Sequence, residues 1–161
     1  KLWVSSSSTD MDLFVTLRAY APDGREVTFL SSMEPKSPVS QGWLRVSHRK
    51  TDPKRSTAWL PVQTHDEEQL LQPGEVVCVE IPVWPASLAL PAGYQLELLV
   101  SGKDFERPVD PHAPKGATRG SGLYTHKDPV DRPAARFNGT YTIHAGEGRD
   151  AHLLLPVINN A

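Results

Sequence analysis

Apolar and polar residues alternate along two neighbouring segments of the chain. Residues 77–83 carry Val or Ile at every second position, and residues 94–100 repeat the alternation with Tyr, Leu and Val. A period of two predicts β-strands with one buried face. Gln72-Pro73-Gly74-Glu75 precedes the first segment, and such Pro-Gly pairs are typical of tight turns. The pattern therefore predicts two adjacent strands that share one core.

The same reasoning extends to the rest of the chain. Asp23-Gly24 is a turn signal and predicts a hairpin between the two flanking apolar segments. The predicted strands are Leu2–Val4, Leu13–Tyr20, Glu26–Leu30, Trp43–His48, Glu75–Trp84, Tyr94–Gly102, Thr140–His144 and His152–Ile158. Pro82 and Pro156 lack an amide donor, so both are expected at a sheet edge or bulge.

Helix is expected to be scarce. Only residues 66–71 have the composition of one short helical turn, which would end before Pro73. About eight strands joined by long connections favour an all-β fold, a jelly-roll (Greek-key) β-sandwich, over an up-and-down barrel.

Length and charge restrict the possible functions. The chain has 161 residues, of which 39% are apolar, a size typical of one domain spanning residues 1–161. Its formal net charge is −2, with acidic and basic residues interspersed. This charge provides no field for capturing nucleic acid or anionic lipid. The apolar stretches are also far shorter than the ~20 residues of a membrane helix.

Residues 103–139 form a long region rich in proline and glycine. A loop of this length is uncommon inside a compact domain. It is either disordered or ordered by packing against a neighbour such as another domain, and order is the expectation from Gly120 onward.

Several literal strings resemble the C-terminal domain of the X-Pro dipeptidyl-peptidase and cocaine-esterase (CocE/NonD) family of serine hydrolases. The strings are GWLRVSHRKTDP at 42–53, LQPGEVVCVEIPVWP at 71–85 and LPAGYQLELLVSGKDF at 90–105. The resemblance continues at residues 2–29, 119–133 and 140–158, so it covers nearly the whole chain.

This resemblance implies a jelly-roll sandwich similar to galactose-binding-like modules. It also implies a Ser-His-Asp triad in an α/β-hydrolase domain N-terminal to this segment, acting on an ester or on a peptide bond after proline. The chain begins at Lys1 without an initiating Met, as expected of a segment cut from a longer protein. We therefore expect a non-catalytic domain that packs on that hydrolase domain and shapes its pocket, with no catalytic, cofactor-binding or metal-binding residue of its own.

The residues themselves give little sign of catalysis. A serine nucleophile usually lies on a G-x-S-x-G elbow, and the nearest approach, Gly120-Ser121-Gly122, lacks that spacing. Cys78 is expected to be a small apolar group in a strand rather than a nucleophile. The interpretation of Asn138-Gly139 is a hairpin turn, although Asn138 also matches a glycosylation acceptor.

The histidine and aspartate spacings favour no transition metal. His48 with Asp52, His65 with Asp66, and His126 with Asp128 reproduce no known ligand spacing. Asp10 and Asp12 could belong to a structural calcium site, but turn capping is the favoured interpretation.

Tryptophan and arginine dominate buried interface hot spots, and they direct attention to a set of candidate residues for interdomain contact. The candidates are Trp43, Arg45, His48, Arg49, Trp59, His126, Asp128, Asp131 and Arg132. A carbohydrate-binding jelly-roll module is the main alternative function, and a small metal-dependent jelly-roll enzyme is the second. A homo-oligomer is possible, and the sequence does not decide the compartment, although the cytoplasm is favoured.

Overall fold

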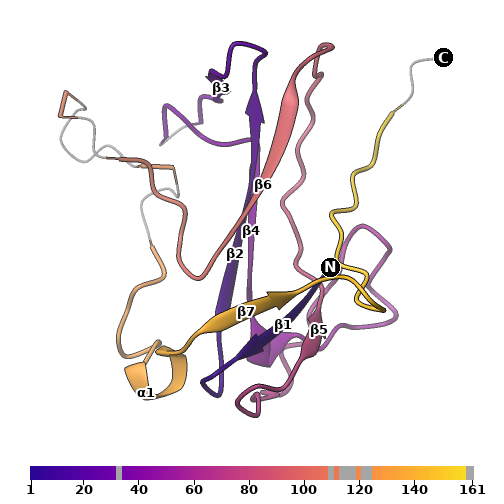
Figure 1. Cartoon of the computed structure of the whole chain (residues 1–161), viewed down its shortest axis with the longest axis vertical. Coiled ribbons are helices and arrows are strands. Elements are labelled where there is room, and N and C mark those ends of the chain that lie inside the picture. Colours follow the sequence, from indigo (N-terminus) through magenta and orange to yellow (C-terminus); the bar gives the residue numbers. More distant parts are fainter. Residues whose placement is uncertain (32–33, 109–110, 113–118, 121–124, 159–161) are drawn as a thin grey trace. The chain divides into compact units, whose positions relative to one another are not determined.

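The computed structural model describes residues 1–31, 34–108, 111–112, 119–120 and 125–158. Its strands are β1 (Leu2–Ser6), β2 (Asp12–Tyr20), β3 (Glu26–Val27), β4 (Ser40–Arg45), β5 (Val77–Val79), β6 (Gln95–Ser101) and β7 (Tyr141–His144). The helical elements among these residues are the 3-10 turn η1 (Val46–His48) and the four-residue helix α1 (Ala134–Phe137). The strands form two antiparallel sheets (Figure 1). The prediction of an all-β chain with little helix is confirmed.

The chain divides into two compact units, each built from separated segments. Unit 1 comprises Lys1–Asp12, Leu44–Pro82 and Pro129–Ala161. Unit 2 comprises Leu13–Trp43 and Val83–Asp128. The single domain expected from chain length stays a prediction.

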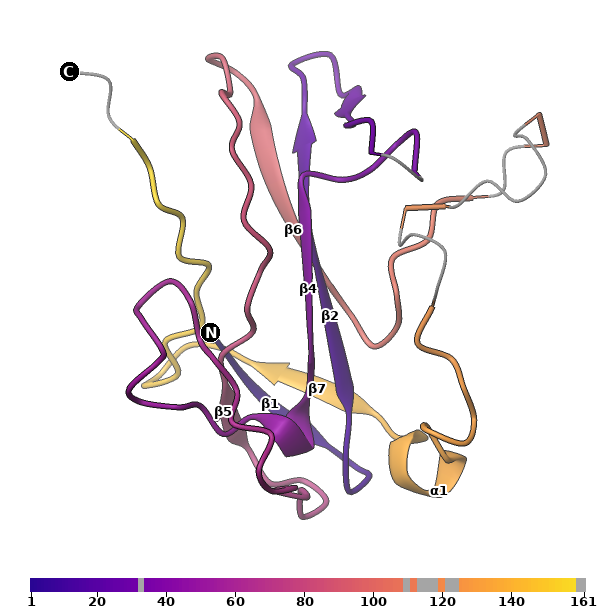
Figure 2. The ribbon, with the colours of Figure 1, turned by 180° about the vertical axis from the view of Figure 1, so that it is seen from behind.

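The sheet of unit 1 has β1 at its centre, with β5 along one side and β7 along the other. Val4 pairs with Val77 of β5 and with Ile143 of β7. Figure 2 shows α1 directly before β7, which then runs beside β1. Val4, Met11, Val46, Leu71 and Val79 are almost completely buried. These branched and flexible apolar side chains form the core of the unit.

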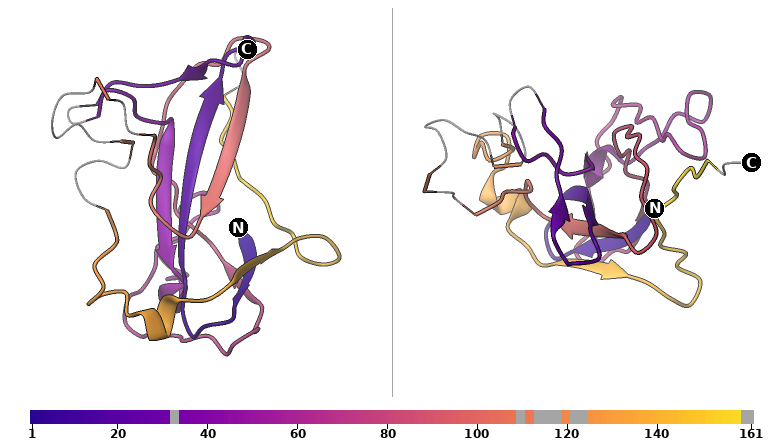
Figure 3. Two further views of the ribbon diagram at one scale, coloured as in Figure 1. Left: turned by 60° about the vertical axis from the view of Figure 1, so that its left-hand side comes forward. Right: turned by 90° about the horizontal axis from the view of Figure 1, so that it is seen from above.

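The sheet of unit 2 is organised around β2, which pairs with β3, β4 and β6. The ladder between β2 and β6 runs from Phe14 opposite Ser101 to Tyr20 opposite Gln95, and the left panel of Figure 3 shows β2 between β4 and β6. Residues 12–17 of β2 are all buried, so this strand is covered on both faces.

The hairpin predicted at Asp23-Gly24 is present between β2 and β3. Gly24 has a φ of 82°, a conformation that glycine adopts without steric cost. Ala21 N donates to Arg25 O at 2.9 Å and closes the turn. The turn prediction is therefore confirmed.

Several predicted elements are shorter or absent. β5 ends at Val79 rather than at Trp84, because its only described strand partner, β1, begins at Leu2 opposite Val79. The strand predicted at residues 152–158 and the helical turn predicted at 66–71 do not form. Pro82 and Pro156 accordingly lie outside strands rather than at sheet edges. Residues 46–48 form η1 instead of extending β4.

The Asn138-Gly139 dipeptide does not make a hairpin turn. Asn138 ends α1, and β7 follows two residues after Gly139. A Cβ atom on residue 139 would lie 2.6 Å from Ser8 Oγ, so only glycine allows the chain to pass this serine. The dipeptide therefore links a short helix to a strand.

Described parts of the proline-rich region contact the rest of unit 2. Arg107 binds Glu26, and Gly120 N donates to Glu34 Oε2 at 2.7 Å. The bond between His126 and Asp104 joins two parts of the region itself. Residues 121–124, which belong to the segment expected to be ordered, lie outside the described residues.

Candidate functional site

Two groups of polar and aromatic side chains stand out, one in each unit. The first, here called the charged network, belongs to unit 1 and consists of Asp10, Asp12, Arg45, Glu68, Asp131, Arg132 and Arg136. The second, here called the aromatic cluster, belongs to unit 2 and consists of Phe14, Trp43, Trp84 and His126.

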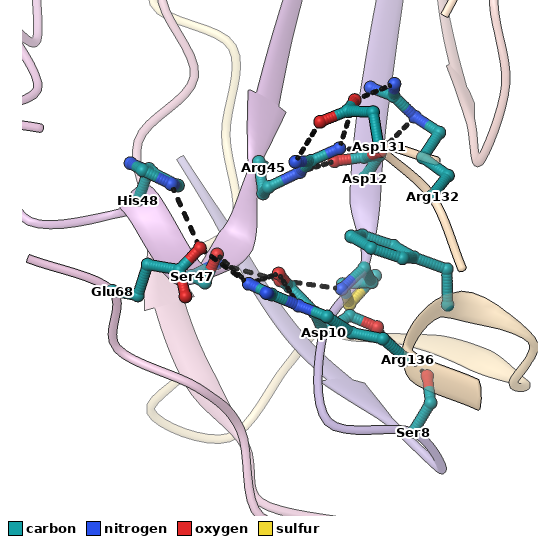
Figure 4. Close-up of polar contacts among 12 residues, drawn as sticks. Ser8, Asp10, Asp12, Arg45, Ser47, His48, Glu68, Asp131, Arg132 and Arg136 are labelled. Carbon is teal, nitrogen blue, oxygen red and sulfur yellow. Dashed lines mark hydrogen bonds and ion pairs between the residues drawn. The ribbon is translucent and has the colours of Figure 1, made fainter. Parts of the chain in front are cut away.

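Asp10 is the buried centre of the charged network. It is 0% exposed, and its Oδ1 accepts hydrogen bonds from Met11 N at 2.9 Å and Ser47 N at 3.0 Å. Its Oδ2 accepts two hydrogen bonds from Arg136, at 3.1 and 2.8 Å (Figure 4). A buried carboxylate must be paired in this way, because an unpaired charge in the interior is very costly.

Arg45 joins Asp12 to Asp131. Its Nε lies 3.0 Å from Asp12 Oδ1, and its Nη2 lies 2.9 Å from Asp131 Oδ2. Arg132 makes a second link, with Nε in an ion pair 2.6 Å from Asp12 Oδ2 and Nη1 2.5 Å from Asp131 Oδ2. The guanidinium of Arg45 also lies 4.7 Å from the ring centre of Phe137. Figure 4 shows Arg45 between the two carboxylates.

The protonation states follow from these pairs. Hydrogen bonds to Asp131, and then to Asp12, raise the pKa of Arg45. The hydrogen bond from Arg136 lowers the pKa of Glu68, and the same bond raises the pKa of Arg136. These shifts keep Arg45, Glu68 and Arg136 charged at neutral pH. The charged network joins four segments of unit 1, near residues 10, 45, 68 and 131–136. It therefore acts as a structural clamp.

His48 and Arg49 lie beside this network. His48 Nε2 is 3.8 Å from Glu68 Oε1, and His48 Nδ1 is 3.3 Å from His65 Nδ1. Arg49 Nη1 donates to the backbone oxygens of Val46 and Gln69. Both side chains thus have partners inside unit 1.

The aromatic cluster brings together residues from β2, from β4 and from two loops. The ring centres of Trp43 and Trp84 are 5.2 Å apart, and those of Trp43 and His126 are 5.5 Å apart. The ring centre of Phe14, which is buried, lies 5.4 Å from that of His126. All three pairs are tilted, which is a favoured geometry for aromatic contacts.

The structure thus distributes the candidate contact residues over several places. It brings Arg45, Asp131 and Arg132 together in one group and Trp43 with His126 in another. Trp59 stands apart in the loop after η1 and is 70% exposed, and Asp128 is exposed in unit 2. Within each unit, the described contacts therefore join only some of the nine residues.

Sequence reasoning missed the roles of Asp10, Asp12, Glu68 and Arg136. The interpretation of the two aspartates as turn caps is incomplete, because their main partners are arginines 33 to 126 positions away. No local sequence motif predicts ion pairs between residues so far apart in the chain. The one available signal was that two carboxylates lie at the start of an apolar strand. A carboxylate buried there needs a cationic partner.

The described residues offer no metal site, since they contain no group of three or more His, Cys, Asp or Glu side chains arranged to hold an ion. Calcium would need carboxylate oxygens of Asp10 and Asp12 as ligands, but arginines already bind these oxygens. None of the helices formed by the described residues has the length and hydrophobicity of a membrane-spanning segment.

One serine–histidine pair resembles part of a catalytic triad. Ser5 Oγ lies 2.8 Å from His144 Nε2 across β1 and β7. Ser5 is buried within the sheet, so a substrate could not reach its hydroxyl, and it is on a strand rather than a strained elbow. This pair is a cross-strand hydrogen bond. Ser121 lies outside the described residues.

Comparisons with known proteins agree with this picture. Residues 1–154 match the family model described as the X-Pro dipeptidyl-peptidase C-terminal non-catalytic domain. No curated protein matches the chain. Two crystal structures of a CocE/NonD family hydrolase from Staphylococcus aureus are each 32% identical to it, with TM-scores of 0.73 and 0.74.

The extent of these matches is also informative. They cover 92% and 93% of this chain but only 25% of the hydrolase chain, so the chain spans about a quarter of that relative. The likeness confirms the prediction of a β-sandwich, whereas the jelly-roll order of connections stays a prediction. This chain belongs to the family of X-Pro dipeptidyl-peptidase C-terminal non-catalytic domains.

Proposed function

We propose that this chain is the C-terminal β domain of a serine hydrolase of the CocE/NonD type, and that it packs on the catalytic domain and holds the loops around its pocket in place. The observation that carries the proposal is the match of 92% of this chain to 25% of such a hydrolase. The parent would hydrolyse an ester or a peptide bond after proline by acyl transfer to water. The role of this domain is to preorganise a site that lies elsewhere.

The geometry of the described residues supports a scaffold rather than an enzyme. The serine of their serine–histidine pair is buried, and each charged side chain of the charged network has an oppositely charged partner within it. The carbohydrate-binding alternative is not favoured, because the family match is to a non-catalytic domain of hydrolases.

Seven of the nine candidate contact residues divide into those that have partners within unit 1 and those that retain exposed surface. Arg45, His48, Arg49 and Arg132 already have partners within unit 1, so we assign them to the internal stability of that unit. Trp43, Trp59 and His126 retain exposed surface, and we propose that some members of this exposed set contact the catalytic domain.

An active-site serine probe tests the proposal. The full-length gene product and the isolated 161-residue chain would each be treated with a fluorophosphonate and assayed with p-nitrophenyl esters and X-Pro anilides. We expect labelling and turnover only in the full-length protein. Circular dichroism of the isolated chain establishes that it is folded, and a labelled serine within these residues would contradict the proposal.

A further inference from the structure

The side chains of the aromatic cluster in unit 2 expose a large apolar area and are also held in a fixed geometry. Trp84 is 63% exposed and Trp43 is 39% exposed. Two adjacent tryptophans with this exposure form an apolar patch of the kind that marks interaction sites.

The backbone around Trp84 is held against β4. Trp84 N donates to Gln41 O at 2.9 Å, and Ser40 Oγ donates to Trp84 O at 2.5 Å. Trp43 belongs to β4 itself and packs on Trp84 at 5.2 Å. Neither indole therefore relies on a flexible loop for its position.

His126 completes the patch and is fixed by Asp104. Its backbone N donates to Asp104 Oδ2 at 2.6 Å, and its Nδ1 donates to Asp104 Oδ1 at 2.8 Å. These two hydrogen bonds to one carboxylate set the ring orientation. Among the described residues they leave Nε2 available to hydrogen-bond a polar group of a partner. The patch thus offers two indoles beside one oriented imidazole.

We propose that Trp43, Trp84 and His126 form the surface through which this domain docks on the catalytic domain of its own parent chain. The inference rests on the proposed function, because the occupant is the part of the hydrolase outside the quarter that this chain matches. Tryptophan is the residue most often found at the centre of interfaces. A rigid patch loses little conformational entropy on contact, which favours stable docking.

Trp59 serves as a chemically matched reference. It is 70% exposed, close to the value for Trp84, but it lies in the loop of unit 1 between residues 51 and 64. No ring contact with another described residue involves it. The hydrogen bonds between Thr57 and Leu60 hold its backbone, but no neighbouring ring of the described residues orients its indole, and this difference singles out the aromatic cluster.

Hydroxyl-radical footprinting of the full-length protein, read by mass spectrometry, tests the inference. In the chain alone Trp84 and Trp59 have similar exposure and would be oxidised at similar rates. In the full-length protein we expect Trp84 to be oxidised at least about fivefold more slowly than Trp59, because docking excludes water from the patch. Leu30 and Val130, which are highly exposed, provide references for unprotected side chains.

The outcomes separate the two proposals. Fast oxidation of Trp84 with protection elsewhere in the chain would overturn the docking surface and leave the proposed function standing. If no side chain of this chain is protected from oxidation in the full-length protein, both the docking surface and the proposed function would be overturned. Protection that disappears on dilution would mean that a second copy covers the patch, and it would also overturn the inference.

A pair of variants of the full-length protein gives an independent readout. Trp84→Ala is expected to speed proteolytic release of this domain from the parent about tenfold, because it removes a central anchor. Trp59→Ala is expected to leave the release rate unchanged. Equal release rates for the two variants would overturn the inference.

Discussion

Asp10 shows how a single residue holds distant parts of unit 1 together. Its two oxygens accept hydrogen bonds from the backbone of Met11 and Ser47 and from the side chain of Arg136. Three chain segments therefore meet at one carboxylate with no access to water. Removing the charge would leave Arg136 without its buried partner, and that penalty exceeds the value of the pair itself.

We therefore expect Asp10→Asn to lower the free energy of unfolding by about 3 kcal/mol, since breaking a buried pair is strongly destabilising. Asp23→Asn is the control, because Asp23 is exposed and lies 3.9 Å from Arg25, so a change within about 0.5 kcal/mol is expected. Urea denaturation measures both variants. Similar losses in the two would show that the network is not a clamp.

Glu26 makes the stability of unit 2 depend on pH. The hydrogen bond from Arg107, together with that from Arg18, lowers the pKa of Glu26 from 4.5 to about 2. A carboxylate with a lowered pKa stabilises the fold fully above its unfolded pKa, and this contribution is lost as the pH falls through the folded pKa. The relevant window runs from pH 4.5 down to about 2.

In this window the wild type is expected to lose about 2–3 kcal/mol more of its unfolding free energy than Glu26→Gln, which lacks the titrating group. Denaturant titrations at several pH values measure the two profiles. The difference between the two profiles reports on Glu26 and on the two arginines that it binds. Parallel profiles would contradict the assignment.

At the scale of elements, pairing decides where a strand ends. The alternating pattern of residues 77–83 extends beyond Val79, but the pairing with β1 ends at Leu2, where β1 begins. The alternation in residues 94–100 survives because β2 supplies a partner along the whole ladder from Gln95 to Ser101. Local pattern thus identifies strands, whereas the length of a partner sets their bounds.

The turn between β2 and β3 gives a test at this scale. Gly24 has a positive φ, and a Cβ there would meet no atom within 4 Å, so the cost of a substitution comes from the backbone alone. Gly24→Ala is expected to lower the unfolding free energy by about 1 kcal/mol. Gly24→Asn, which tolerates this conformation better, should cost about half as much. Equal losses in thermal or urea unfolding would contradict a purely conformational cause.

At the scale of the whole molecule, the chain passes repeatedly between its two units. The boundaries fall after Asp12, Trp43, Pro82 and Asp128, so neither unit is one continuous segment. A discontinuous unit cannot complete its fold before the rest of the chain is in place. This connectivity favours the prediction of one domain.

We accordingly expect a single cooperative unfolding transition, with coincident midpoints by far-ultraviolet circular dichroism and tryptophan fluorescence. Fluorescence reports on both units, because Trp3 and Trp59 belong to unit 1 and Trp43 and Trp84 belong to unit 2. Two separated transitions would contradict the single-domain prediction.

The candidate site was predictable only in part. Trp43 and His126 were identified as contact residues from their residue types, and the structure places them side by side. The pairing of His126 with Asp104 was not foreseen, because it depends on how the proline-rich region folds back on its own first residues. Arg45 was chosen for an interdomain contact, yet it binds Asp12 and Asp131 in its own unit. A sequence shows that a charge is present but not which distant charge it meets.

By itself, the sequence determined the all-β class, most strand positions, the Asp23-Gly24 turn and the family, because periodicity, turn chemistry and literal strings are local properties. Only the tertiary structure decided the bounds of β5, the loss of the strand at 152–158, the charged network and the joining of Trp43 with Trp84. These features depend on partners far away along the chain, and the free energy of burying a charge or a ring is set by what surrounds it in space.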